Sequence, residues 1–221
     1  LEPGVFLVIP ANRSRLRSVN FQDTQLIGVL ARADASLSQL SGLLQGLVDR
    51  FALHDAPLYL VGGSVRDALL GRLGNDLDFT TPARPDVVYA ILEDWAETVW
   101  DTGIDYGTVS AAYKGQQIEI TTFRSDSYDG DSRNPEVIYG DTLEGDLVRR
   151  DFTVNAMAIE LRPDGTREFH DPMGGLQDLA DRVLDTPDAP EISFHDDPLR
   201  MLRAARFAAQ VEFDVAKRVR T

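Results

Sequence analysis

The most constraining feature of this chain is a short apolar stretch, residues 58–61, that runs directly into Gly62-Gly63 and then into a helical pattern. Glycines let a backbone turn tightly and approach a ligand, and the free N–H groups of a first helical turn attract anions. Ser64 and Asp67 have the S-x-x-D spacing of a capping box, which predicts a helix over 65–70 with Arg66 on its first turn. A phosphate-binding turn and a plain strand-to-helix turn are both compatible with this order.

A second predicted strand, 76–80, carries Asp76 and Asp78 in alternation with apolar residues. Because strand side chains alternate in direction, both carboxylates share one face, with their Cα atoms roughly 6.6 Å apart. Such a pair can hold one or two Mg²⁺ ions, which prefer oxygen ligands. Glu119, in the strand-like segment 116–123, is the candidate third carboxylate. Taken alone, a D-x-D pattern is more often a solvated strand end.

Adjacent arginines, Arg149 and Arg150, open an ordered segment that extends to residue 160. Neighbouring residues cannot share one face of a helix, so we expect one arginine to enter a phosphate site and the other to pair with Asp146 or Asp151. Asn155 could hold a sugar hydroxyl or a backbone group. A solvated pair at a helix start is the alternative.

A polar stripe recurs every third residue along a helix predicted from residue 196 onward. Its members are Asp197, Arg200, Arg203 and Arg206, and the apolar side of the same helix is formed by Leu199, Leu202 and Phe207. The stripe is either a salt-bridged surface or a base reader, since a carboxylate and a guanidinium satisfy the amino donor and ring-nitrogen acceptor of cytosine and adenine. The carbonyl of guanine or uracil would be repelled by the carboxylate.

The remaining pattern predicts a mixed α/β sheet and three segments. These are an N-terminal arm and helix over 1–55, with the arm at 1–22 and one helix over 23–51, a sheet domain over 56–185, and the start of a helical domain over 186–221. The acidic, glycine-containing segment 126–146 is expected to be a mobile loop.

Composition limits the chemistry. The 22 basic and 36 acidic residues give a formal charge of −14, which excludes a passive nucleic-acid coat, and the lack of cysteine excludes disulfides, thiolate zinc sites and cysteine nucleophiles. His54, His170 and His195 are too scattered in sequence to predict a metal site. Apolar runs too short to span a bilayer lead us to expect a soluble, cytoplasmic protein without a membrane partner.

Together these motifs resemble the class II tRNA nucleotidyltransferase and poly(A) polymerase family over roughly residues 58–213. Residues 60–67 with 76–78 look like its catalytic motif, 149–158 like its second motif and 197–206 like its nucleotide-reading helix, with 118–124 and 171–175 in the expected order. The resemblance implies a DNA polymerase beta-like nucleotidyltransferase head with a mixed sheet, followed by the start of a helical neck. It implies that Asp76 and Asp78 hold catalytic Mg²⁺, and Glu119 is the third catalytic candidate from its strand position. The implied nucleotide-binding residues are Gly62, Gly63, Ser64, Arg66, Arg150, Asp197, Arg200, Arg203 and Arg206.

The activity that the resemblance implies is Mg²⁺-dependent, template-independent addition of C and A (CCA) to the 3′ end of tRNA from CTP and ATP, with release of pyrophosphate. The implied partners are the tRNA 3′ end and the two nucleotides, with no protein partner. A poly(A) polymerase, or an enzyme that adds only C or only A, shares these motifs. Nucleotidyl transfer to a small molecule would leave the Asp197 stripe without a purpose, and the two aspartates disfavour an RNA-binding module without catalysis. Asp196 stands where the family's reading helix usually has Glu.

Overall fold

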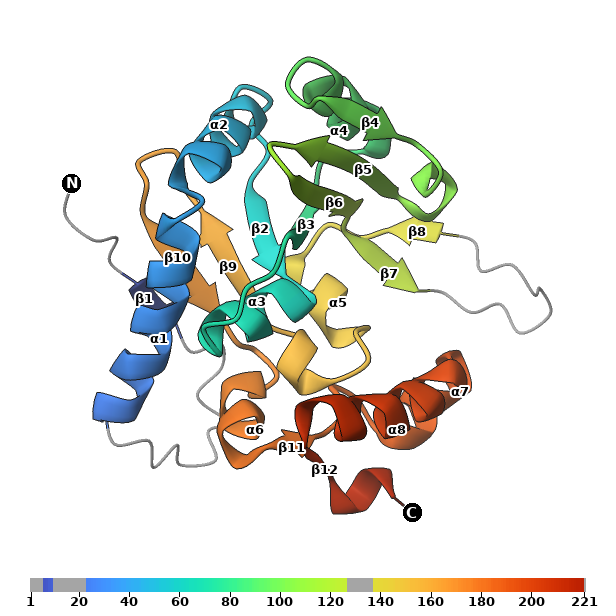
Figure 1. The fold of residues 1–221 in the computed structure, drawn as a ribbon. Helices are drawn as coiled ribbons and strands as arrows, with labels where there is room; N and C mark the ends of the chain where they lie inside the picture. Colours follow the sequence, from blue (N-terminus) through green and yellow to red (C-terminus); the bar gives the residue numbers. More distant parts are fainter. Residues whose placement is uncertain (1–5, 10–22, 127–136, 221) are drawn as a thin grey trace.

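One mixed β-sheet organises the computed structural model, which describes residues 6–9, 23–126 and 137–220 (Figure 1). Its eight strands follow the order β1-β10-β9-β2-β3-β6-β5-β4. Their bounds are β1 Phe6–Ile9, β2 Leu58–Val61, β3 Asp76–Thr81, β4 Thr98–Trp100, β5 Thr108–Tyr113, β6 Gln116–Thr122, β9 Ala158–Leu161 and β10 Arg167–His170. The pairs β1·β10 and β3·β6 are parallel and the other neighbours are antiparallel, so the predicted mixed α/β class is confirmed.

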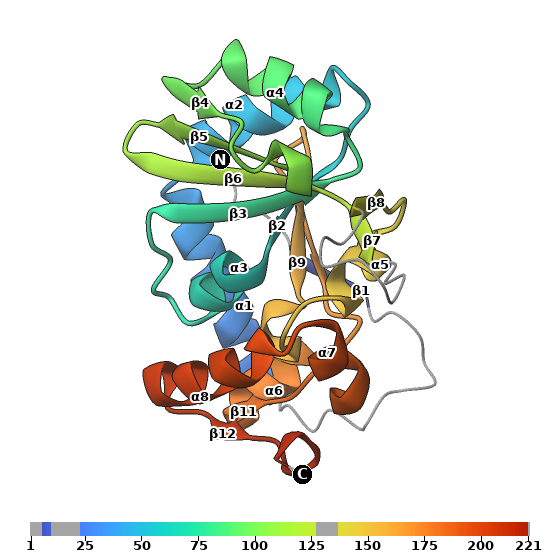
Figure 2. The same cartoon turned by 90° about the vertical axis from the view of Figure 1, so that its right-hand side faces the viewer.

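Helices and two small ladders surround this sheet. The helices are α1 Asp23–Ser38, α2 Ser41–Ala52, α3 Gly62–Leu69, α4 Pro85–Glu93, α5 Leu143–Val148, α6 Gly175–Asp181, α7 Pro190–Asp196 and α8 Leu199–Val211, with 3₁₀ turns η1 Ile104–Tyr106, η2 Thr153–Asn155 and η3 Lys217–Val219. The ladders pair β7 Arg124–Asp126 with β8 Val137–Tyr139, and β11 Val183–Leu184 with β12 Asp214–Val215. Figures 1 and 2 show α6, α7 and α8 together at one end of the molecule, at the bottom of both views. Among the described residues, no helix is long and apolar enough to cross a membrane.

The two faces of the sheet differ in character. Leu77 and Phe79 of β3 are buried in the large core that also contains side chains of α1, α2 and α4. On the opposite face, Leu147 of α5 packs with Val61 and Ala158 in a smaller apolar cluster. Because side chains alternate along a strand, Asp76 and Asp78, which flank Leu77, lie on this second face.

The single helix predicted over 23–51 is wrong, because the chain breaks at residues 39–40 between α1 and α2. Leu37 of α1 and Leu44 and Leu47 of α2 are buried in the same core. The apolar spacing therefore continues across the turn, and the sequence pattern does not show the break.

Two segments predicted to be irregular contain regular structure. In the expected loop 126–146, β8 and the start of α5 are ordered, and Thr142 caps α5 by accepting a hydrogen bond from Gly145 N–H at 3.2 Å. Residues 127–136 of that loop lie outside the described residues. Most of the predicted arm 1–22 does too, but β1 within it pairs with β10 at the sheet edge.

The prediction for the C-terminal helix needs a correction. α8 begins at Leu199 rather than at residue 196, because α7 ends at Asp196. Leu199 and Leu202, expected on the buried side, are 62% and 69% exposed, whereas Ala204 is buried and Phe207 packs on the core. The division of the chain at 185/186 stays a prediction, and β11 and β12 pair across it.

Candidate active site

The site begins at Gly62, where β2 turns directly into α3. The residue has a φ of +67°, in the left-handed region that favours glycine. A Cβ there would lie 2.9 Å from Arg150 Nη1 and 3.7 Å from Asp78 Oδ2, so Gly62 lies between a guanidinium and a carboxylate. At Gly63 the atom nearest to a Cβ would be Arg66 Nη2, at 3.4 Å.

Ser64 does not cap α3 as predicted. The helix starts three residues earlier than predicted, at Gly62, with Val61 at its N-cap and no side-chain cap. Ser64 Oγ instead donates to the Asp76 carbonyl at 3.2 Å and accepts from Asp78 N–H at 2.9 Å. Its hydroxyl thereby fastens the first residues of β3 to the start of the helix and positions both aspartates.

Three carboxylates share the polar face of β3 and β6. Asp78 is the register partner of Glu119, and Asp76 precedes it by two residues on the same face. Burial, with Glu119 and Asp76 adding to it, raises the pKa of Asp78 to about 6 against the opposing effect of Arg150 and Arg66. Crowded carboxylates of this kind are stabilised by a bound cation, and an all-oxygen donor set fits Mg²⁺.

Arg66 is a buried connector. Its guanidinium donates to both oxygens of Asp67, at 3.0 and 2.9 Å, and to Asn155 Oδ1 at 2.6 Å, while it lies 4.8 Å from the ring centroid of Phe207. Asn155 in turn donates to Asp151 Oδ1 at 3.0 Å. Asn155, predicted to hold a sugar hydroxyl or a backbone group, thus links α3 and the second motif through two side chains.

Arg149 and Arg150 were expected to take separate partners, but both pair with Asp146. Arg149 Nη2 lies 2.8 Å from its Oδ1, and Arg150 Nη2 lies 3.1 Å from its Oδ2. The two oxygens of the Asp146 carboxylate in α5 each face one of the guanidinium groups, so two adjacent arginines can share one partner. Burial alone would raise the pKa of Asp146, but the adjacent Arg150 and Arg149 hold it below its usual value.

The predicted polar stripe divides into parts with different surroundings. Asp197 precedes α8, and its carboxylate accepts from Leu199 N–H at 2.9 Å and from Arg203 Nη2 at 2.6 Å. Arg203 also lies 3.5 Å from Asp151, which connects the stripe to the second motif. Arg200 is 9% exposed and donates to Ser193 Oγ at 2.8 Å and to the Arg149 carbonyl at 2.5 Å. Arg206 is exposed.

Comparison with known proteins identifies the family of this chain. A family profile described as "Poly A polymerase head domain" matches residues 58–185, more than half of the chain. The chain belongs to the poly A polymerase head-domain family. It is 43% identical to a CCA-adding enzyme of Lactobacillus helveticus over 161 residues (72% of this chain and 38% of that protein), and 41% identical to one of Geobacillus stearothermophilus over 172 residues (77% and 41%). The chain spans about two-fifths of the length of the curated relatives it matches.

Solved structures agree with the head-domain assignment. The Bacillus stearothermophilus CCA-adding enzyme in complex with CTP matches with a TM-score of 0.66 and 38% identity, over 79% of this chain and 40% of that chain. A CCA-adding enzyme in apo form II gives 0.71 and 30%, over 87% and 44%. A tRNA nucleotidyltransferase complexed with a primer tRNA and an incoming ATP analog gives 0.64 and 31%, over 79% and 47%. The predicted resemblance is therefore confirmed.

Within this head domain, the structure brings some of the predicted residues together near Gly62, whereas residues of the polar stripe contact α7 and the second motif instead. Asp78 and Arg150 both lie within 4 Å of the position that a Gly62 Cβ would occupy, and Glu119 is the register partner of Asp78 on β6. Sequence reasoning missed the part played by Phe207, which stacks on Arg66, and gave Asp146 only one of its two arginines. The sequence signal that could have placed Asp146 is Thr142, a helix N-cap residue, because Asp146 lies in the first turn of the helix α5 that begins after it.

Proposed function

We propose that this chain is the catalytic head of an enzyme that adds C and A to the 3′ end of tRNA from CTP and ATP and releases pyrophosphate. The observation that carries the proposal is the meeting of Asp78, Gly62 and Arg150 at the start of α3, with Asp76 and Glu119 on the same face of the sheet. An acidic metal-binding face beside an anion-binding turn suits phosphoryl transfer. The relatives named CCA-adding enzyme, and the match to a structure with primer tRNA and an ATP analog, support tRNA as the substrate.

Mg²⁺ is the proposed cofactor, held by Asp76 and Asp78 with Glu119 beside them. When bound there, it would lower the pKa of the attacking 3′ hydroxyl and neutralise charge on the triphosphate. The protein's part is to hold these carboxylates in place, which Ser64 does through the backbone of β3. No covalent intermediate with the protein is required.

The triphosphate would lie at the start of α3. Gly62 and Gly63 offer backbone N–H groups at a helix N-terminus, and the missing side chain of Gly62 leaves room beside Arg150. Among the described residues, Arg150 Nε is a buried donor with no hydrogen-bond partner. Asp146 holds Arg150 through Nη2, and Arg150 Nη1 lies beside Gly62, where it can donate to a phosphate. Arg66 was expected to contact the nucleotide; its guanidinium is bonded to Asp67 and Asn155, so we propose that it supports this turn.

Base selection is assigned to the start of α8. Asp197 and Arg203 already contact each other, which places a carboxylate acceptor beside guanidinium donors. Cytosine and adenine match that pair, whereas guanine or uracil would meet an unpaired carbonyl at a cost of about 1–3 kcal/mol. Arg200, through the Arg149 carbonyl, would anchor α8 to the second motif, and the exposed Arg206 would reach triphosphate or ribose oxygens.

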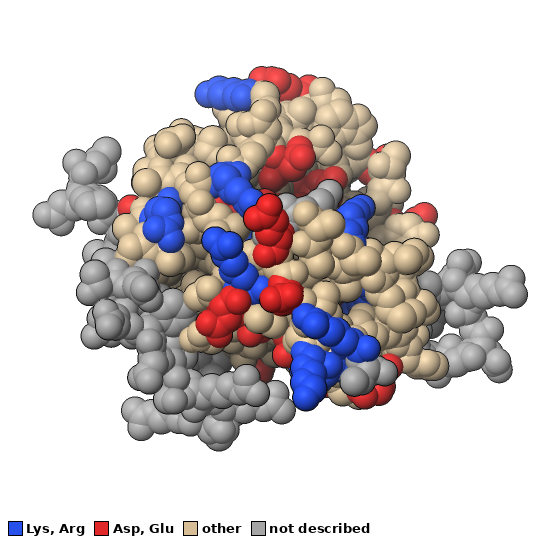
Figure 3. All heavy atoms as spheres, turned by 60° about the horizontal axis from the view of Figure 1, so that its bottom comes forward, with Lys and Arg blue, Asp and Glu red and all other residues tan. Residues whose placement is uncertain are grey.

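The RNA is proposed to approach the end of the molecule that carries α6–α8. In Figure 3, which brings this end forward, basic and acidic side chains lie side by side. Local pairing rather than a broad basic field would then guide the tRNA 3′ end. We place the reaction in the cytoplasm.

Extension of defined transcripts tests the function. The chain, with Mg²⁺, would be given tRNA ending before, within and after CCA and each labelled nucleotide separately. Two C additions followed by one A support the proposal. A ladder of A alone would show a poly(A) polymerase, and C-only or A-only products a partial enzyme. Nucleotidyl transfer to a small molecule without RNA would contradict tRNA as the substrate.

A further inference from the structure

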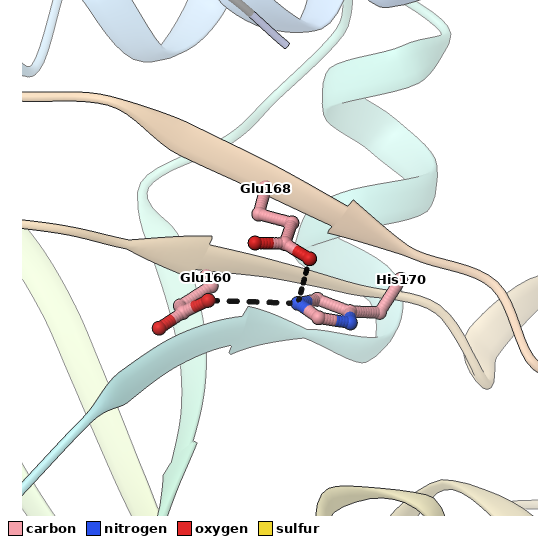
Figure 4. Close-up of side chains that lie close together, drawn as sticks. All are labelled: Glu160, Glu168 and His170. Carbon is pink, nitrogen blue, oxygen red and sulfur yellow. Dashed lines mark ion pairs between the residues drawn. The ribbon is translucent and has the colours of Figure 1, made fainter. Parts of the chain in front are cut away.

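A second cluster of metal-binding side chains lies on β9 and β10, away from the proposed active site. Glu160 and Glu168 are register partners directly opposite each other, and His170 lies two residues further along β10 (Figure 4). The three offer one ligand atom each, all within 4.8 Å of one another. In the sheet, β2 separates these strands from β3 and its aspartates.

The cluster brings two carboxylates together with one compensating guanidinium, that of Arg162. Like charges directly opposite each other across a strand pair are destabilising, and the Glu168 side chain is only 6% exposed. His170 Nε2 is 3.7 Å from Glu160 Oε2 and 4.0 Å from Glu168 Oε1, beyond hydrogen-bond distance. Among the described residues, this nitrogen is buried without a hydrogen-bond partner. One imidazole nitrogen and two carboxylates, with ligand atoms within 4.8 Å of one another, offer the ligands of a cation.

We propose that Glu160, Glu168 and His170 form a site for a divalent transition-metal ion of the Zn²⁺ type. Zn²⁺ binds imidazole and carboxylate at about 2.0–2.2 Å, so two ligands on one tetrahedral ion are about 3.4 Å apart. His170 Nε2 lies 3.7 and 4.0 Å from the two carboxylates, and all three ligand atoms lie within 4.8 Å of one another, so the side chains must move closer together by up to about 1.4 Å to bind one ion. A mixed nitrogen and oxygen set favours Zn²⁺ over Mg²⁺, which prefers oxygen.

Neighbouring residues support an accessible and oriented imidazole. The ring of Tyr59 stands edge-on to His170, with centroids 5.9 Å apart. A pocket lined by Tyr59, Leu147, His170 and Pro172 gives a path to the ring.

Arg162 is the competitor for this site. Its Nη2 lies 2.9 Å from Glu160 Oε2 and also contacts Glu168, so one guanidinium bridges both carboxylates. The Arg162 side chain is 40% exposed and can turn outward when a metal ion replaces it. This competition separates a metal site from an ordinary ion-pair network, because removing Arg162 would weaken the network but strengthen metal binding.

The test is calorimetric titration of the chain with Zn²⁺ in the presence of excess Mg²⁺, which occupies oxygen-only sites. We expect one saturable site that His170→Gln weakens by at least about 100-fold, since even residues outside a ligand set contribute about 10- to 100-fold. Arg162→Gln should bind more tightly than wild type. His54→Ala, an exposed histidine after α2, is the matched control and should bind as wild type does.

Two spectroscopic readouts keep the test independent of catalysis. Zn²⁺ should raise the Tm of wild type and of Arg162→Gln, and the rise should be larger in the variant. Co²⁺ should give ligand-field absorption bands that persist in excess Mg²⁺ and are absent in His170→Gln. Wild type without saturable Zn²⁺ binding, undiminished affinity in His170→Gln, or weaker binding in Arg162→Gln would each overturn the proposal.

Discussion

Neutralising Asp146 should lower the stability of the head domain strongly. Its carboxylate is fully buried and accepts from Arg149 Nε and Nη2, Arg150 Nη2 and Arg124 N–H. Asp146→Asn keeps the shape but places an amide donor against guanidinium donors. Removing one partner of a buried ion pair costs about 3–5 kcal/mol, so we expect that loss in the free energy of unfolding. Urea denaturation at pH 7 measures it.

The pH dependence gives this prediction a sign. The pKa of Asp146 is lower in the folded than in the unfolded chain, so its contribution is complete above the unfolded value of about 3.9. It is lost as the pH falls through the lower folded pKa. The difference between wild type and Asp146→Asn should therefore be constant from pH 7 to about pH 4 and shrink below that.

The control is Asp141→Asn, which changes a 92% exposed carboxylate 4.0 Å from Arg84 and should leave stability nearly unchanged. A cost below about 1 kcal/mol for Asp146→Asn, or a cost that stays the same well below pH 4, would refute this account of the buried pair.

Three further predictions concern the site. Gly62→Ala should lower the free energy of unfolding by about 1–2 kcal/mol, because the residue has a positive φ. Since the new Cβ displaces Arg150, the variant should also raise the KM for nucleotide by about tenfold in steady-state assays. Gly74→Ala, where a Cβ meets nothing within 4 Å, should change neither quantity. Asp197→Ala should relax the preference for C and A more than it lowers triphosphate affinity, and unchanged selectivity in competition assays would exclude its role as a base reader. Because the pKa of Asp78 is raised to about 6, protons compete with the metal ion below that pH. Calorimetry should show that the Mg²⁺ affinity falls below about pH 6, by up to about tenfold for each pH unit. Equal affinity at about pH 5 and about pH 7.5 would contradict this assignment.

The parts of the site that the sequence predicts are those governed by local spacing. Alternation along β3 places Asp76 and Asp78 on one face, and the buried stretch before Gly62 forms β2 with the predicted bounds. In these places one element and its period are enough to orient a side chain.

The errors arise where a distant segment decides the partner. Ser64 fits a capping box, but β3 comes close enough to take its hydroxyl away from the helix. Arg149 and Arg150 converge on one acid because α5 presents Asp146 to both. His170 seemed isolated because only the register of β9 and β10 brings Glu160 beside it. Such contacts depend on tertiary packing, which spacing alone does not encode.

The measurement that tests the central claim most directly compares wild type with Asp78→Asn in single-turnover extension of a tRNA lacking CCA, with labelled CTP and Mg²⁺. Asp78 lies in the proposed metal site, where burial and the neighbouring acids raise its pKa. Neutralising this carboxylate should therefore not lower the stability of the metal-free protein. We expect the variant to keep its Tm and lose turnover by at least about 1,000-fold. Extension by Asp78→Asn at a rate close to that of wild type would contradict the assignment of this face of the sheet as the catalytic site.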